Sequence, residues 1–334
     1  MTSRYASAHT YTQGPGDARP TALRIIQDEK LADKLQDKVA LITGCSSGIG
    51  IETARALKET GMRIFCAVRN LEKGQQALAS ILDPGRCELI HLDLNSLSSV
   101  RKCAEEIKQK TSQLNILITN AGIMACPEGR TEDGFERQFG TNYLAHFLLF
   151  HLLKPLLLSS ATLEFGSRVV CVSSESHRQC PGINFENVNL ENGEYTPPKA
   201  YAQSKLAVVY MANEIERRYG QRNLHGLALH PGGIETGLTR HIPPAFVKAM
   251  WAQLPGLKDY MKSPEQGAAT QVWAAISTEL EGKGGIYLED CGIAGPCENP
   301  KNPLAPGYGE KTFDQEEEGK LWEICLKMVG VEGS

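Results

Sequence analysis

The chain has 334 residues, of which 41% are hydrophobic and 22% are charged, a composition typical of a soluble globular protein. Its 35 basic and 39 acidic residues leave a net charge of −4, which indicates no general attraction to nucleic acid or to an anionic membrane. The ten cysteines are scattered without a Cys-x-x-Cys pair. We therefore expect reduced thiols in a cytoplasmic protein rather than a zinc site or a disulfide framework.

Residues 1–36 form an N-terminal extension of two parts. The first 20 residues are rich in Ser, Thr, Gly and Pro, which predicts a mobile tail. A short helix is predicted after the tail, because apolar residues recur there at roughly helical spacing, at Leu23, Ile26, Leu31 and Leu35.

From residue 37 to residue 334, short β-rich runs alternate with longer amphipathic stretches. This pattern predicts one α/β domain of the Rossmann type, a doubly wound parallel sheet of about seven strands with helices on both faces. The predicted strands are 39–42, 63–68, 88–92, 116–118, 169–172, 227–229 and 286–288. The longest apolar stretch, residues 147–158, is shorter than the roughly 20 residues of a spanning helix, so we expect a buried helix and no stable membrane span.

The first predicted strand leads into a helix through the glycine-rich segment Thr43-Gly44-Cys45-Ser46-Ser47-Gly48-Ile49-Gly50. Backbone N–H groups and the helix dipole favour phosphate at such a place. Gly44 allows a sharp turn, Gly48 lets the backbone approach a pyrophosphate and Gly50 permits close helix packing, although the spacing differs from G-x-G-x-x-G. A simple turn is the alternative. The position between strand and helix favours a dinucleotide site formed by Gly44, Ser46, Ser47, Gly48, Ile49 and Gly50.

Tyr201 and Lys205 are four residues apart, which places both side chains on one face of a helix. A phenol has a pKa near ~10, and a neighbouring ammonium group lowers it, so this pair can transfer a proton near neutral pH. Taken alone, the spacing is also compatible with an ordinary surface helix.

The glycine-rich segment and the Tyr-x-x-x-Lys pair together resemble the classical short-chain dehydrogenase/reductase family, over about residues 37–290. The resemblance implies further cofactor contacts in chain order. They are Asp93 and Leu94 at the adenine, the Asn120-Ala121-Gly122 turn, and Pro231, Gly232 and Thr236 near the nicotinamide, to which Tyr201 and Lys205 also belong.

Within that family, the chain resembles the retinol dehydrogenases and the dehydrogenase part of the WW-domain oxidoreductase. Residues 172–177 (Val-Ser-Ser-Glu-Ser-His) and 201–206 (Tyr-Ala-Gln-Ser-Lys-Leu) carry this resemblance. The N-terminal extension and residues 44–53 are similar to fungal members of the branch, which implies a role in fungal secondary metabolism.

The resemblance also implies the catalytic roles. Ser174 would hold the substrate oxygen, Tyr201 would donate or accept the proton, and Lys205 would lower the pKa of Tyr201 and bind the nicotinamide ribose. Asn142 would hold a water molecule of a proton relay, and a satisfied core amide is the alternative reading of this residue. Residues 177–199 would form a loop near the site, and we assign no acid or base role to His177.

Arg69 follows the second predicted strand, where a guanidinium group can bind the 2′-phosphate of NADP(H). The glycine-rich segment has Ser46 and Ser47 where NADP-binding relatives often have a second basic residue. We therefore expect NADP(H) as the preferred cofactor and keep NAD(H) as the alternative, in which Arg69 is only solvated.

Residues 236–263 are predicted to form a substrate lid. Its apolar residues, which are also compatible with plain packing, are Ile242, Phe246, Met250, Trp251 and Leu254. We expect a ketoreductase-type oxidoreductase acting on a lipophilic or aromatic carbonyl compound or alcohol. A non-redox isomerisation or cyclisation, or a dinucleotide-sensing role, is the alternative function. A homodimer through the helices of Asn142 and Tyr201 would be usual for the family.

Overall fold

The computed structural model describes residues 3–331, apart from the side chain of Met250. Its core is an eight-stranded sheet in the order β3-β2-β1-β4-β5-β6-β7-β8. The strands are β1 (Val39–Thr43), β2 (Arg63–Val68), β3 (Cys87–His91), β4 (Ile116–Thr119), β5 (Ser167–Val172), β6 (Leu224–His230), β7 (Ile286–Glu289) and β8 (Gly292–Ile293). The seven predicted strands are all present and parallel, and the sequence analysis missed only the two-residue antiparallel β8.

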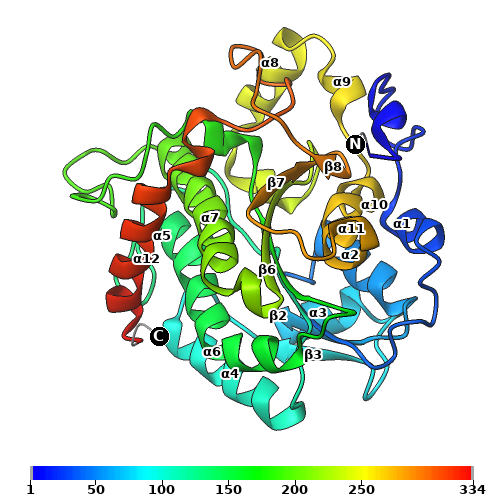
Figure 1. Cartoon of the computed structure of the whole chain (residues 1–334). Coiled ribbons are helices and arrows are strands. Elements are labelled where there is room, and N and C mark those ends of the chain that lie inside the picture. The colour runs from blue at the N-terminus through cyan, green and yellow to red at the C-terminus, as the bar shows by residue number, and fades with distance from the viewer. Residues whose placement is uncertain (1–2, 332–334) are drawn as a thin grey trace.

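Helices cover both faces of this sheet (Figure 1). The α-helices are α1 (Ala22–Asp28), α2 (Ile49–Lys58), α3 (Leu71–Ala77), α4 (Leu97–Lys110), α5 (Arg137–Phe139), α6 (Ala145–Ser160), α7 (Pro197–Tyr219), α8 (Pro244–Gln253), α9 (Leu257–Tyr260), α10 (Pro264–Gly267), α11 (Ala269–Ile276) and α12 (Gln315–Val329). Successive strand residues point to opposite faces. Leu41 therefore packs in the core with α4, α6 and α7, whereas Ile42 packs in the core with α1, α2 and α11. The predicted doubly wound fold is confirmed.

One helical run within residues 3–331, Arg137–Ser160, is long and apolar enough to span a membrane. It comprises α5, a π-helical turn η2 (Gly140–Leu144) and α6. Phe147, Phe150 and Leu153 of this run are completely buried against the sheet and its neighbouring helices. Such burial is typical of the core helix of a globular domain.

The C-terminal helix α12 packs beside α7 and reaches α6 (Figure 1). It begins behind Asp314, whose side chain accepts a hydrogen bond from the Glu317 N–H group, and it ends at Gly330, which has a φ of +60°. The ring of Trp322 contacts Phe147 and Phe150 of α6. Part of the surface of α6 and α7 is thus covered by the chain's own last helix.

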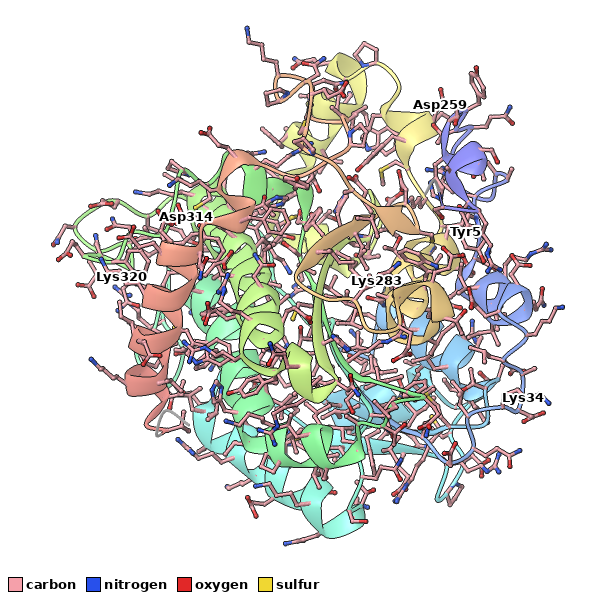
Figure 2. All side chains as sticks on the ribbon, viewed as in Figure 1. Tyr5, Lys34, Asp259, Lys283, Asp314 and Lys320 are labelled. Carbon is pink, nitrogen blue, oxygen red and sulfur yellow. The ribbon has the colours of Figure 1, made fainter. Side chains whose placement is uncertain are left out.

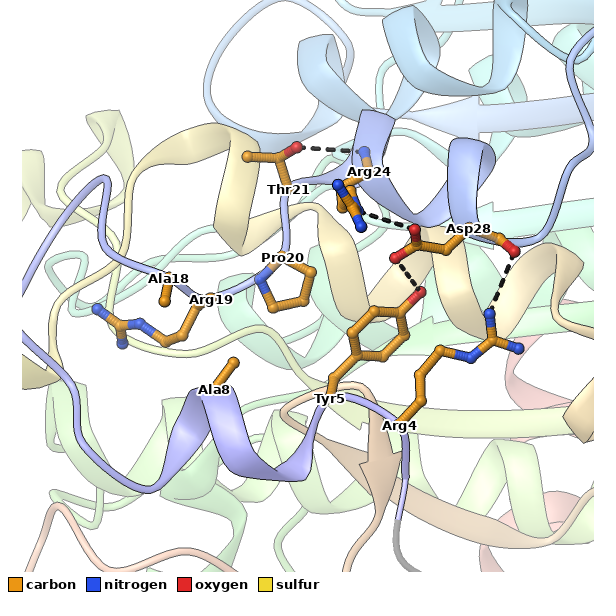
Figure 3. A pocket seen from close by; sticks show the side chains of 9 residues that line it. All are labelled: Arg4, Tyr5, Ala8, Ala18, Arg19, Pro20, Thr21, Arg24 and Asp28. Atoms are coloured by element: carbon orange, nitrogen blue, oxygen red, sulfur yellow. Dashed lines mark hydrogen bonds and ion pairs between the residues drawn. The ribbon is translucent and has the colours of Figure 1, made fainter.

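The N-terminal extension differs from the predicted mobile tail, because residues 3–20 pack against the domain. They include the short 3₁₀ helix η1 (Ala6–His9), and Tyr5 next to it is only 6% exposed. A cavity of about 430 Å³ lies between this segment and α1 (Figure 3). There Asp28 accepts a hydrogen bond from the Tyr5 hydroxyl group and forms an ion pair with Arg24. These charges lining the cavity are therefore already paired.

Candidate active site

Ser174, Tyr201 and Lys205 come together at the carboxyl end of β5. Ser174 lies two residues after β5, and the other two residues are on α7, which begins at Pro197 behind the N-cap Thr196. All three side chains are buried. Lys205 ties its helix to the strand end, because its Nζ donates a hydrogen bond to the Val172 carbonyl at 2.9 Å.

The proton affinities of Tyr201 and Lys205 differ from the prediction. Lys205 Nζ lies 5.7 Å from the centre of the Tyr201 ring. Burial lowers the pKa of Lys205 to about 8, since a desolvated ammonium group loses its proton more easily. Burial and then the charge of Glu175 raise the pKa of Tyr201 well above its ordinary value. The structure thus reverses the predicted lowering, because burial disfavours the phenolate and the charge of Glu175 adds to this effect, whereas only the hydrogen bond with Ser174 acts in the opposite direction.

The hydroxyl group of Ser174 is engaged by its neighbour in the chain. Its Oγ donates to Glu175 Oε2 at 3.0 Å and accepts from the Ser176 N–H group at 3.2 Å. Glu175 Oε2 also lies 3.1 Å from His230 Nε2 at the end of β6. Since burial lowers the pKa of His230, this ring is neutral near pH 7. The serine hydroxyl group therefore donates to a side chain that also contacts the His230 ring.

Asn142 lies in the π-helical turn η2, where its side-chain amide is almost fully used. Its Nδ2 donates to the Ile123 carbonyl at 3.0 Å and to Ser204 Oγ at 2.9 Å, and its Oδ1 accepts from the Ile123 N–H group at 2.8 Å. The side chain is thus the satisfied core amide that was the alternative reading. Both N–H donors of the amide are engaged, so the predicted water molecule would have to donate a hydrogen bond to an oxygen atom of Asn142.

The glycine-rich segment joins β1 to α2 in the predicted way. Gly44 has a φ of +78°, and a Cβ atom there would lie 2.8 Å from the Cα of Ala121. Gly48 has a φ of +61°, and a Cβ atom there would lie 3.2 Å from Thr236. Only glycine satisfies both the left-handed backbone and the close approach. Thr236 and Ala121, two predicted cofactor contacts, are consequently neighbours of this loop.

The Asn120-Ala121-Gly122 turn adds a polar group that the protein leaves unpaired. Asn120 Nδ2 donates to the Thr43 carbonyl at 2.8 Å, whereas Asn120 Oδ1 is buried and has no hydrogen-bond partner among residues 3–331. A buried acceptor without a partner is costly unless a ligand supplies a donor. Ribose hydroxyl groups are such donors. The bare loop backbone and this acceptor together fit a dinucleotide.

The remaining predicted cofactor residues lie around the same edge of the sheet. Arg69, just after β2, is exposed and makes no ion pair or hydrogen bond with the residues described. Asp93 Oδ1 accepts from the Asn95 N–H group at 2.9 Å, and Leu94 is buried. Pro231 and Gly232 directly follow β6. Ser46, Ser47 and Ile49 lie in the loop and at the start of α2.

His177, the first residue of the segment expected to form a loop, is buried and hydrogen-bonded. It is 1% exposed, with Nδ1 2.7 Å from the Ser174 carbonyl and Nε2 3.1 Å from Thr312 Oγ1. Burial lowers its pKa to about 4. A neutral ring with both nitrogen atoms occupied serves to hold the C-terminal segment against Ser174.

Sequence reasoning missed Glu175, His230 and Tyr260 as members of the site. Tyr260 OH, at the end of α9, lies 2.9 Å from His230 Nε2. Two of the three had a signal, because Glu175 adjoins Ser174 and His230 adjoins Pro231 in the chain. Nothing local indicates that Tyr260 reaches the same place.

Residues 38–245, over half of the chain, match the short chain dehydrogenase family. The chain belongs to this family. Short-chain dehydrogenase/reductase prx1 of Penicillium roqueforti is 53% identical over 328 residues, which cover 98% of this chain and 95% of the relative. Human Retinol dehydrogenase 14 is 38% identical over 319 residues, which cover 89% of this chain and 88% of the relative. The predicted place among the fungal members of the retinol dehydrogenase-like branch is confirmed.

A solved structure agrees with the architecture. The Pseudomonas aeruginosa RhlG/NADP active-site complex superimposes with a TM-score of 0.62 at 26% identity, covering 78% of this chain and 96% of that one. The short-chain dehydrogenases use NAD(P)(H) and a small-molecule substrate. The chain is therefore an oxidoreductase of this kind.

Proposed function

We propose that the chain is an NADP(H)-dependent oxidoreductase that interconverts a lipophilic or aromatic ketone or aldehyde and its alcohol. The observation that carries this proposal is the convergence of buried Ser174, Tyr201 and Lys205 at the carboxyl end of β5. A binding module would have no need of a buried tyrosine and lysine at this spacing.

A bound nicotinamide dinucleotide supplies or accepts the hydride. Tyr201 then gives its proton to the substrate oxygen in reduction, or takes one from the alcohol in oxidation. Its raised pKa keeps the phenol protonated at neutral pH, which is the state that a proton donor requires. The residue is therefore better prepared for reduction than for oxidation near pH 7.

Ser174 acts on the substrate oxygen in this reaction, and Lys205 acts on the position of the nicotinamide. The Ser174 hydroxyl, which now donates to Glu175, turns its hydrogen toward the substrate oxygen and stabilises the charge that develops there. Lys205 would hold the ribose next to the nicotinamide, which sets the distance between the reacting atoms. Asn120 Oδ1 would accept a hydrogen bond from the dinucleotide.

The preference for NADP(H) is supported by Arg69. Its exposed guanidinium group at the end of β2 has no protein partner among the residues described, so it is free to bind a 2′-phosphate. The NADP complex of the structural neighbour is consistent with this preference.

A lipophilic substrate is supported by the lid, residues 236–263. Phe246 and Trp251 on α8 are 63% and 41% exposed, which is unusual for large apolar side chains. Retinol, after which the human relative is named, is itself a lipophilic alcohol. All ten cysteines are free thiols, which supports a reducing compartment such as the cytoplasm.

The experiment is to incubate the purified protein with NADPH and a panel of lipophilic ketones and aldehydes, and to follow the absorbance of the reduced nicotinamide. Tyr201→Phe should abolish turnover while NADPH binding persists. Tyr210→Phe is the matched control, because Tyr210 is a buried tyrosine of the same helix whose hydroxyl bonds to Glu317 instead. Unchanged turnover in Tyr201→Phe would show that this phenol is not the proton donor.

A further inference from the structure

The N-terminal extension holds the end of the substrate lid through one buried arginine. Arg19 is 3% exposed, and its guanidinium group donates to the carbonyls of Asp259 at 3.2 Å, Tyr260 at 2.7 Å and Met261 at 2.5 Å. These carbonyls are at the C-terminal end of α9, where helix carbonyls lack partners within the helix. Figure 3 shows the side chain extending away from the Arg4, Asp28 and Arg24 cluster.

The charge of Arg19 is balanced inside the same segment. Asp17 Oδ1 accepts from Arg19 Nε at 2.8 Å. Burial by itself would raise the pKa of Asp17, but the hydrogen bond from Arg19 and further backbone bonds lower it to about 2. Gln266 of α10 donates to Asp17 Oδ1 at 3.0 Å and to the Arg19 carbonyl at 3.2 Å. Arg19 is therefore a fully paired group, built to stay in place.

A second contact from the extension reaches the same end of the lid. His9 Nδ1 lies 3.1 Å from Asp290 Oδ1, and this carboxylate accepts from Lys262 Nζ at 2.7 Å. Lys262 Nζ also lies 3.2 Å from the carbonyl of Pro231, in the segment predicted to meet the nicotinamide. In Figure 2, Asp259 and the N-terminal segment are neighbours. The extension thus holds residues 259–261 through Arg19, and its His9 ring lies beside the ion pair of Lys262 without a hydrogen bond of its own to the residues described.

From the held end of the lid, a line of polar contacts leads to the catalytic serine. Tyr260 OH lies 2.9 Å from His230 Nε2, which is 3.1 Å from Glu175 Oε2. His230 Nδ1 accepts from the Glu175 N–H group, so the neutral ring carries its proton on Nε2, between the two oxygen atoms. Glu175 in turn accepts from Ser174 Oγ at 3.0 Å. Each member has its orientation fixed by the next.

We propose that Arg19 is a positioning residue for the reaction, which anchors the C-terminal end of the lid and thereby holds Tyr260, His230 and Glu175 in register with Ser174. The inference rests on the proposed function. It makes the N-terminal extension a structural part of the substrate site. The lid can then adapt to substrate only at its α8 end, because residues 259–261 stay fastened.

The test compares Arg19→Met with Arg24→Met. Arg24 is the matched control, an exposed arginine five residues along the chain whose guanidinium group pairs with Asp28 and, among the residues described, makes no hydrogen bond or ion pair with the lid. We expect Arg19→Met to raise the KM for the carbonyl substrate by about tenfold while the KM for NADPH and the kcat change less than about threefold. Arg19→Lys, which keeps a cationic donor, should restore part of the loss. Arg24→Met should behave as the unmodified protein.

A second variant guards against a mere folding defect. Tyr260→Phe removes one hydroxyl group, and it should raise the same KM about threefold, with Arg19→Met adding less in this background than alone. Equal effects of Arg19→Met in both backgrounds would overturn the line from Arg19 to Ser174. So would a loss that falls on NADPH and the carbonyl substrate alike.

Hydrogen exchange of residues 254–262 in the cofactor-free protein is a readout independent of turnover. Arg19→Met should speed up exchange there, whereas Arg24→Met should not. If no carbonyl compound is turned over but exchange rises, the proposed function fails and the anchoring stands. If turnover is present and exchange is unchanged, the anchoring fails and the proposed function stands.

Discussion

The ring of Trp322 on α12 stands edge-on to the ring of Phe147 on α6, with ring centres 5.0 Å apart and planes at 81°. The Arg218 guanidinium of α7 lies over the same indole at 4.8 Å from the ring centre. One tryptophan thus joins the last helix to α6, which continues the π-helical turn of Asn142, and to α7, which carries Tyr201. This is the surface through which a family homodimer was expected.

We predict that the purified protein is a monomer. A dimer formed through α6 and α7 would have to displace α12, which covers part of the surface of these two helices. Light scattering on the purified protein should give the mass of one chain. A dimer whose mass persists on dilution would contradict this prediction, and cross-links between α6 helices of two chains would show that α12 moves aside.

Trp322→Ala should lower the free energy of unfolding by about 3–5 kcal/mol, the usual cost of removing a buried tryptophan. Urea denaturation followed by circular dichroism measures the loss. Trp251→Ala is the control, because Trp251 is 41% exposed on the lid, and we expect its effect on stability to be within about 0.5 kcal/mol. If the loss in Trp322→Ala were as small as the loss expected for Trp251→Ala, the packing of α12 would contribute little to the stability of the fold.

Lys205 should make the stability of the cofactor-free protein depend on alkaline pH. Burial lowers its pKa from 10.5 to about 8, so the unfolded chain binds more protons between these values. Above the unfolded pKa, Lys205 is neutral in both states and its burial costs no stability. The free energy of unfolding then decreases as the pH falls from 10.5 to about 8, because the unfolded chain gains a proton that the folded protein binds less tightly. The decrease amounts to about 3 kcal/mol over this window.

The corresponding measurement is denaturation of the protein and of Lys205→Met at several pH values from 7 to 10.5. The stability difference between the two should change with pH, in favour of the variant at the lower end. Taking this difference removes the effects of the buried tyrosines and cysteines. A difference independent of pH would show that Lys205 is not desolvated.

Glu175→Gln should shift the pH dependence of turnover. The carboxylate raises the pKa of Tyr201, so a neutral amide of the same shape removes part of that shift. In alcohol oxidation, the rise of kcat/KM with pH should move to lower pH. Glu194→Gln, at an exposed glutamate that pairs with Lys199, is the control and should leave the profile in place. If the pH dependence of kcat/KM is unchanged in Glu175→Gln, this carboxylate does not influence the proton transfer.

Arg69→Ala should weaken NADPH binding about tenfold and leave NADH binding nearly unchanged, since only the former has a 2′-phosphate. Titration of protein fluorescence with either cofactor measures both. Arg86→Ala is a suitable control, because Arg86 is exposed next to the N-terminal end of β3, away from the cofactor edge of the sheet. Equal effects on NADPH and NADH would show that Arg69 does not bind the 2′-phosphate.

The local features of this protein could be predicted because they depend on neighbours in the chain. The seven parallel strands were visible as short apolar runs, and Gly44 and Gly48 lie where a strand must turn tightly into a helix. Tyr201 and Lys205 share a face because helical geometry depends on spacing alone. These patterns also sufficed to place the chain in its family.

Proton affinities and distant contacts were decided by the tertiary structure. Tyr201 has a raised pKa because its surroundings exclude water, a property of packing that no spacing reveals. The amide of Asn142 is consumed by Ile123 and Ser204, from two other segments. Arg19, in what reads as a flexible tail, meets Tyr260 across 241 residues of sequence. Burial and pairing between remote segments exist only once the chain has folded, and here they determine how Tyr201 and Ser174 are held.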